Sequence, residues 1–227
     1  MPYQMTESIK AIDKRHMYSK HEELYNSLTH LLGLLLSIVA LILLIVKAAT
    51  YGSGITVLAV TIYGVTLCMM YGGSALYHGV SHMRIKRHLR TFDHLNIYFL
   101  IAGTYTPVAL IGLNNAIGWI IFGLLWGVTI IGILYKTLFF GDSWVSTILY
   151  VIMGWTALGF IVQIVQALPD VCLLWIILGG IFYTNGVIFY MMDEKVEGCH
   201  VTWHLFVLVG SICHFFAIYF YLAALKV

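Results

Sequence analysis

The segment GCHVTWHLFVLVGSICHFFAIYF, residues 198–220, determines the class of this protein. It is almost entirely apolar apart from His200, His204 and His214. It is long enough to cross the ~30 Å hydrocarbon core of a bilayer, which takes about 20 residues of helix. The segment therefore predicts a membrane-spanning helix. Its histidines need an explanation, because ionisable side chains are costly inside a membrane.

The composition of the whole chain agrees with a membrane protein. Of its 227 residues, 61% are hydrophobic and 10% are charged, and the mean hydropathy is +0.92. A soluble domain is nearer ~50% apolar and ~25% charged, and one this apolar would expose large aggregating patches. The formal net charge of +2 is too small to indicate binding to nucleic acid, which is not expected as a partner.

Seven apolar runs approach the length of a membrane span, and short polar breaks separate them. The runs cover residues 28–46, 55–77, 92–112, 117–135, 145–167, 171–191 and 201–225. No stretch between them is long enough to form a soluble domain. The sequence therefore predicts an all-α integral membrane protein, with a polar N-terminal segment, 1–27, and a single seven-helix transmembrane domain, 28–227.

The basic residues predict which way the bundle crosses the membrane. With the N-terminus in the cytosol, ten of the 12 lysines and arginines fall on cytosolic segments and only Lys47 and Lys226 fall outside. Cytosolic loops of membrane proteins carry this excess of basic residues. The same rule, together with contact to anionic lipid, explains the basic stretch RIKRHLR, 84–90. We expect a multi-pass protein of the cell membrane with a cytosolic N-terminus and an external C-terminus.

On this topology, polar residues from three predicted helices meet at one depth near the cytosolic face. His200 and His204 are four residues apart, so they share one helix face, about 6 Å apart along the axis, and can bind one metal ion. His78 offers a third nitrogen for a zinc site that keeps a position open for water. Asp93 can bind directly or deprotonate that water, and Ser74, one turn before His78, can hydrogen-bond the water or a substrate carbonyl. The alternative is a pair of interfacial histidines that hydrogen-bond lipid headgroups.

Other polar residues have roles that the sequence leaves open. Glu22, Asn26 and His30 follow one stripe of the first helix, which is either an acidic helix N-terminus or a polar strut against the metal region. His94 is a candidate to support the metal ligands. His214 lies about 15 Å deeper than those ligands, so it either bonds to a neighbouring helix or lines a substrate cavity.

Two patterns bear on helix packing. Gly123 and Gly127 form a small-xxx-small pattern, for which contact between helices of one chain is expected and a dimer face is the alternative. Pro107 is expected to distort the third span.

Several motifs resemble a known family. SALYH (74–78), FDHLNIYFLIAGTYTP (92–107) and HVTWHLFVLVGSICHF (200–215) resemble the progestin and adipoQ receptor superfamily, and EELYNSLTHLLG (22–33) is similar to its bacterial hemolysin III branch. The resemblance implies a seven-helix fold with zinc near the cytosolic face. The three zinc-binding histidines of the family match His78, His200 and His204. An aspartate that approaches the zinc through a water matches Asp93, and a serine matches Ser74.

The resulting functional hypothesis is zinc-dependent hydrolysis of a lipid amide, as in the alkaline ceramidases with which this superfamily is often grouped. Asp93 would be the general base, and Ser74 would steady the oxyanion. The alternatives are a non-catalytic zinc that staples helices in a membrane sensor or regulator, a cytolysin or channel as the branch name suggests, and a receptor or transporter. Membrane lipids are the expected partners, and the sequence sets no oligomeric state.

Overall fold

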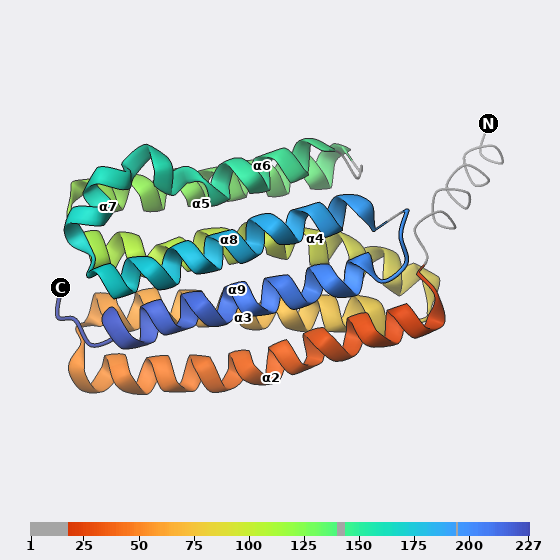
Figure 1. Ribbon diagram of the computed structural model, residues 1–227, viewed down its shortest axis with the longest axis horizontal. Helices are drawn as coiled ribbons and strands as arrows, with labels where there is room; N and C mark the ends of the chain where they lie inside the picture. The colour runs from red at the N-terminus through yellow and green to blue at the C-terminus, as the bar shows by residue number, and fades with distance from the viewer. Residues whose placement is uncertain (1–17, 140–143, 194) are drawn as a thin grey trace.

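The computed structural model describes residues 18–139, 144–193 and 195–227, and within these ranges the chain contains helices and no strands. The elements are α2 (Lys20–Tyr51), α3 (Gly54–Gly79), α4 (Met83–Pro107), the π-helix η1 (Val108–Leu113), α5 (Ala116–Phe139), α6 (Trp144–Gly154), the 3₁₀-helix η2 (Thr156–Phe160), α7 (Ile161–Ala167), α8 (Asp170–Met192) and α9 (Cys199–Tyr221). They form seven helical spans that are long and apolar enough to cross a membrane, which confirms the predicted fold class. The spans lie along one long axis, and the start of α2 and the C-terminus lie at opposite ends of it (Figure 1).

The first helix begins earlier than its apolar run. Ser19 caps α2, because its Oγ accepts a hydrogen bond from the backbone N–H of Glu22 at 3.2 Å. The helix therefore starts at Lys20 rather than at residue 28, and its first two turns are polar. Residues 1–17 of the predicted N-terminal segment lie outside the described ranges.

The basic stretch that follows α3 is helical. Sequence hydropathy places the third span from residue 92, whereas α4 begins at Met83 and includes the basic residues. Lys86 is buried, and its ammonium group is directed into the protein, where it donates to the backbone oxygen of Tyr77 at 2.9 Å. The interpretation that contact with anionic lipid explains this stretch is therefore wrong for Lys86. Hydropathy does not detect an amphipathic helix with this much charge.

Local distortions interrupt two of the spans. After Pro107 the backbone continues in the wide turns of η1, which is the form that the predicted distortion takes. The fifth span is divided into α6, η2 and α7. On α5, a Cβ atom built at Gly123 or Gly127 meets no described atom within 4 Å, so the predicted contact inside the chain at these glycines is wrong.

The core is concentrated around α3, α4 and α9. Close packing joins α2 to α3, α3 to α4, and α8 to α9, and α2 also packs against α9. Among the described residues, α8 is not closely packed against α6 or α7. In the apolar 18-residue window that identifies each span, 61% of the span that combines α4 and η1 is buried, but only 11% and 17% of the spans 145–167 and 170–192. The well-packed half of the bundle is therefore the half that can hold a rigid site.

Candidate metal centre

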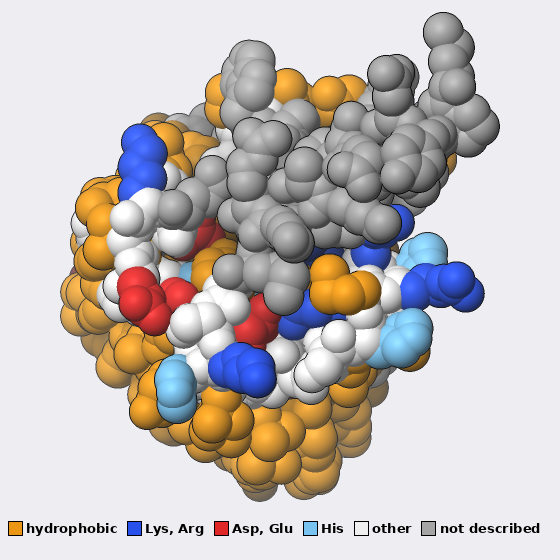
Figure 2. All heavy atoms as spheres, turned by 90° about the vertical axis from the view of Figure 1, so that its right-hand side faces the viewer, with side chains coloured by type: hydrophobic (Ala, Val, Ile, Leu, Met, Phe, Trp, Pro, Cys, Tyr) orange, Lys and Arg blue, Asp and Glu red, His pale blue; other side chains and the backbone are white. Residues whose placement is uncertain are grey.

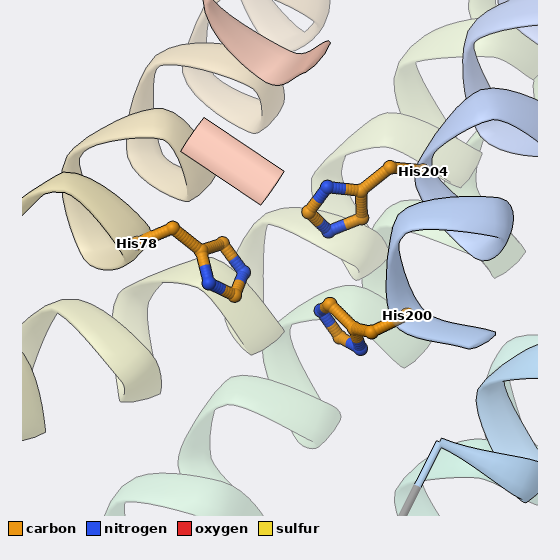
Figure 3. A group of neighbouring side chains, drawn as sticks. All are labelled: His78, His200 and His204. Atoms are coloured by element: carbon orange, nitrogen blue, oxygen red, sulfur yellow. The ribbon is translucent and has the colours of Figure 1, made fainter. Parts of the chain in front are cut away.

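Three histidines converge at the end of the bundle where α2 begins. His78 comes from the last turn of α3, and His200 and His204 come from the first two turns of α9. Their rings point toward one another (Figure 3), and one nitrogen from each lies within 4.8 Å of the other two. The side chains are well shielded, since the residues are 4%, 7% and 1% exposed. The i, i+4 spacing and the matched depth of His78 predicted this convergence.

Two of the three imidazoles are oriented by carboxylates. His78 Nδ1 lies 2.8 Å from Glu23 Oε2, and His200 Nδ1 lies 2.7 Å from Asp193 Oδ2. A carboxylate bonded to one ring nitrogen is the usual support for a histidine that binds metal through the other nitrogen. The sequence pattern did not predict these contacts of Glu23 and Asp193. The only signal for them was an acidic residue at each of two predicted span ends.

The other ring nitrogens have the properties of metal ligands. Nε2 of His78 and Nε2 of His200 are buried and have no hydrogen-bond partner among the described residues. A buried polar atom without a partner lowers the stability of the fold by about 1–3 kcal/mol, so a ligand that binds to these nitrogens would stabilise the folded chain. Three buried imidazoles with a remaining water position are the donor set of a catalytic zinc site. The residues present therefore fit a zinc ion.

His204 is supported by α2. Its Nδ1 lies 3.3 Å from the backbone oxygen of Asn26 and 3.3 Å from Thr29 Oγ1. The ring of His30 stacks on the His204 ring, with centroids 3.5 Å apart and planes 15° apart. The side chains of Asn26 and His30 are fully buried, and their polar atoms have no hydrogen-bond partner among the described residues. Two members of the predicted stripe on the first helix therefore lie directly against the histidine cluster.

Glu22, the third member of that stripe, has a different task. Its Oε1 accepts a hydrogen bond from the backbone N–H of Gly198 at 3.0 Å. This bond ties α2 to the turn that leads into α9, whose second residue is His200. Glu22 therefore belongs to the acidic first turn of α2 and also contacts the start of α9 through the backbone, so both interpretations of the stripe describe it.

Asp93 and Ser74 lie beside the cluster. Ser74 is completely buried and Asp93 is 8% exposed. The Asp93 carboxyl group interacts electrostatically with Ser74 and His200. Asp93 does not belong to the group of nitrogens within 4.8 Å, and Ser74 Oγ and Asp93 Oδ1 have no hydrogen-bond partner among the described residues. Ser74 and Asp93 therefore form a neighbouring pair beside His200, where both side chains can contact a water or a ligand.

Tyr18, the first residue that the structure describes, packs against the histidine cluster. Its ring centroid lies 4.5 Å from that of His200 and 5.8 Å from that of His78. Its hydroxyl donates to Asp193 Oδ2 at 2.8 Å and lies 2.8 Å from His200 Nδ1. Burial, and then the nearby Asp193 carboxylate, raise the pKa of the Tyr18 phenol, so it remains a hydrogen-bond donor. Nothing in the sequence pattern predicted this residue.

Two other histidines lie outside the cluster. His94 Nδ1 lies 2.7 Å from Lys136 Nζ on α5, so its described partner is a lysine and not a metal ligand. His214 Nε2 lies 3.1 Å from the backbone oxygen of Ile176 on α8. The prediction that His214 bonds to a neighbouring helix is confirmed.

Charged side chains gather at this end of the bundle. Figure 2 shows lysine, arginine, aspartate, glutamate and histidine side chains on the face that carries the start of α2, with hydrophobic side chains around it. Lys20, His21, Arg84, Arg87 and His88 belong to this end and are exposed. The histidine cluster therefore lies just inside a polar end of an otherwise apolar surface.

Comparison with known proteins identifies relatives over nearly the whole chain. The family model described as Haemolysin-III related matches residues 18–215. The chain is 41% identical over 202 residues to Hemolysin-3 of Bacillus cereus, covering 88% of this chain and 91% of that protein. It is 39% identical over 207 residues to the Hemolysin-3 homolog of Bacillus subtilis (strain 168), covering 90% and 96%. It is also 31% identical over 174 residues to the human Monocyte to macrophage differentiation factor, covering 71% and 69%.

Proposed function

The chain belongs to the Haemolysin-III related family of multi-pass membrane proteins, and from this membership and its histidine cluster we propose that it is a zinc-dependent hydrolase of lipid amides. The observation that carries the proposal is the group of three buried histidines whose ring nitrogens converge. In this proposal His78, His200 and His204 hold the zinc. A zinc ion in such a site lowers the pKa of a water molecule and polarises a carbonyl group.

The chain itself supplies the acid–base chemistry. Asp93 takes a proton from the attacking water as general base, since its carboxyl group is close enough to the cluster to interact electrostatically with His200. Ser74 donates a hydrogen bond to the carbonyl oxygen as negative charge develops there. Its hydroxyl is completely buried and lies next to the Asp93 carboxyl group. The reaction breaks the amide bond and releases a fatty acid and an amine.

The membrane location supports a lipid as substrate. Lys20, Arg84, Lys86, Arg87 and Arg90 belong to the helix ends near the histidines, whereas Lys47 lies near the far end of α2. By the positive-inside rule the histidine end faces the cytosol, in the cell membrane. The spans 145–167 and 170–192 are the least buried of the seven, so we expect a lipid chain to approach the centre from their side.

Metal analysis and lipid hydrolysis test the proposal together. We expect about one zinc per wild-type chain purified without chelators, and its loss in His78→Ala, His200→Ala and His204→Ala. The matched control is His88→Ala, which removes an exposed histidine from the same end and is expected to keep the metal. Asp93→Asn should keep the zinc and lower hydrolysis of a ceramide in mixed micelles by about 10²–10⁴-fold. A metal-free wild-type protein would refute the proposal.

A non-catalytic zinc is the second candidate. The histidines come from α3 and α9, and two of them are held by carboxylates, which would equally suit a staple between helices. A staple predicts that Asp93→Asn changes neither zinc content nor any lipid turnover. A cytolysin or channel has less support, because His214 bonds to a backbone oxygen of α8 and Asn185 donates to the oxygen of Ile181 on its own helix. Conductance of wild-type protein in liposomes would favour that alternative.

A further inference from the structure

Glu23 links a buried lysine to one of the clustered histidines. Its Oε2 lies 2.8 Å from His78 Nδ1, and its Oε1 lies 3.0 Å from Lys86 Nζ. The three side chains come from α2, α3 and α4, and their exposed fractions are 15%, 0% and 11%. Each carboxylate oxygen of Glu23 therefore has its own partner in a partly desolvated place.

Lys86 is itself fixed. Its ammonium group donates to the backbone oxygen of Tyr77 at 2.9 Å and lies 4.8 Å from the centroid of the Tyr77 ring. Tyr77 directly precedes His78 in α3, so the lysine is anchored to the same turn of helix that presents the histidine. With one oxygen held by Lys86, Glu23 cannot rotate freely or enter the histidine cluster as a ligand.

This arrangement determines which nitrogen of His78 carries the proton. An ionised carboxylate accepts hydrogen bonds and cannot donate one. The 2.8 Å contact therefore requires a hydrogen on Nδ1, and in the neutral ring Nε2 is left with its lone pair. That nitrogen is buried and has no described partner, so it is the nitrogen that His78 can contribute to the group of three histidines.

We propose that Glu23 is a positioning residue of the metal site, which holds His78 in the Nδ1–H form, and that Lys86 keeps the Glu23 carboxylate in place for this task. The inference rests on the proposed metal site for its purpose. The proton arrangement itself is a property of the metal-free chain. Glu23 is expected to affect how tightly zinc binds without touching the metal or the substrate.

The substitution Glu23→Gln gives an unusual expectation. Lys86 would hold the carbonyl oxygen of the new amide, which turns the NH₂ group toward His78 Nδ1. Since an NH₂ group donates, it favours a ring with the proton on Nε2, the nitrogen that the metal needs. We expect zinc affinity to fall by about 10- to 100-fold. Adding Lys86→Met releases the amide to rotate, so the double variant should bind zinc several-fold more tightly than Glu23→Gln alone.

Two measurements test the proposal. Zinc affinity is measured by competition with a chromogenic chelator, and the proton position on His78 is read from ¹⁵N shifts of histidine-labelled, metal-free protein, assigned with His78→Gln. The matched control is Glu22→Gln, which changes the adjacent carboxylate. Its new amide oxygen can still accept from the N–H of Gly198, so zinc affinity should stay within about threefold of wild type.

The outcomes separate this proposal from the metal site itself. The proposal is supported if His78 carries its proton on Nδ1 in the metal-free wild type and on Nε2 in Glu23→Gln. This support holds even if the wild type binds no zinc, because that result would refute only the proposed function. A wild-type His78 with its proton on Nε2 overturns it and needs no variant to fold. Equal losses of zinc affinity in Glu22→Gln and Glu23→Gln, or a double variant that binds no better than Glu23→Gln, also overturn it.

Discussion

Gly33→Ala tests how closely α2 must approach α3 behind the histidine cluster. A Cβ atom at Gly33 would lie 2.7 Å from Cε1 and 2.8 Å from Cγ of Tyr71, which is well inside ordinary van der Waals contact. Tyr71 is 1% exposed, and its hydroxyl donates to Ser211 Oγ at 2.7 Å. Its ring also meets the His30 ring edge-on, with centroids 5.1 Å apart. The alanine must therefore displace a ring that is held on several sides.

The expected cost follows from these contacts. Overpacking a core costs about 1–3 kcal/mol, and weakening the Tyr71 hydrogen bond costs about 0.5–1.5 kcal/mol more. Alanine in place of glycine in a helix returns about 1 kcal/mol. The net expectation is that the free energy of unfolding falls by about 2 kcal/mol. Because His30 stacks on His204, zinc affinity should fall as well.

Denaturant titration in mixed micelles, followed by circular dichroism, measures this change. The matched control is Gly180→Ala on α8, where a Cβ atom meets no described atom within 4 Å. That variant should be as stable as wild type or more stable by up to about 1 kcal/mol. If Gly33→Ala is as stable as Gly180→Ala, the close packing of α2 on Tyr71 is not what the distances indicate.

Three further predictions concern the residues that support the histidines and the metal that the histidines are proposed to hold. Asp193→Asn removes the carboxylate from His200 Nδ1 and should weaken zinc binding by about 10- to 100-fold in chelator competition; an unchanged affinity would show that Asp193 does not orient the ring. Because the pKa of Tyr18 is raised, Tyr18 should not ionise in the ordinary tyrosine range near pH 10. The tyrosinate absorbance in that range should therefore be the same in wild type and Tyr18→Phe, and a smaller absorbance in the variant contradicts this. Chelator should lower the thermal midpoint of the wild type but not of His204→Ala. A ligand at about 100 times its Kd adds about 2.7 kcal/mol to the free energy of unfolding, and only the wild type would lose this contribution. Equal shifts in the two proteins would place the metal elsewhere.

Hydropathy was sufficient to predict the spans but not where the helices begin. The seven apolar runs correspond to the seven spans of the structure. Hydropathy missed the polar first turns of α2 and the basic start of α4, because it measures how apolar the side chains are and not whether the backbone forms a helix. Caps such as Ser19, and inward contacts such as that of Lys86, set these boundaries.

The histidine cluster could be predicted, but its supports could not. Depth along each span is readable from the sequence, so His78 and the pair on α9 were placed together correctly. The support given by Glu23 and Asp193 depends on how each helix is rotated about its axis, which one sequence does not determine. The sequence showed that Glu22, Asn26 and His30 share one stripe, and all three are buried, yet the neighbouring Glu23 makes the contact with His78.

The chain order of the cluster constrains biosynthesis. Glu23 and His78 lie on the first and second spans, whereas His200 and His204 lie on the seventh, which leaves the ribosome last. Earlier spans enter the membrane while this final helix has still to be made. The three histidines therefore cannot come together before residue 204 has been made, and a polypeptide that stops before residue 200 lacks two of the three imidazoles. A metal ion held by all three would thus mark a chain whose synthesis has reached the seventh span.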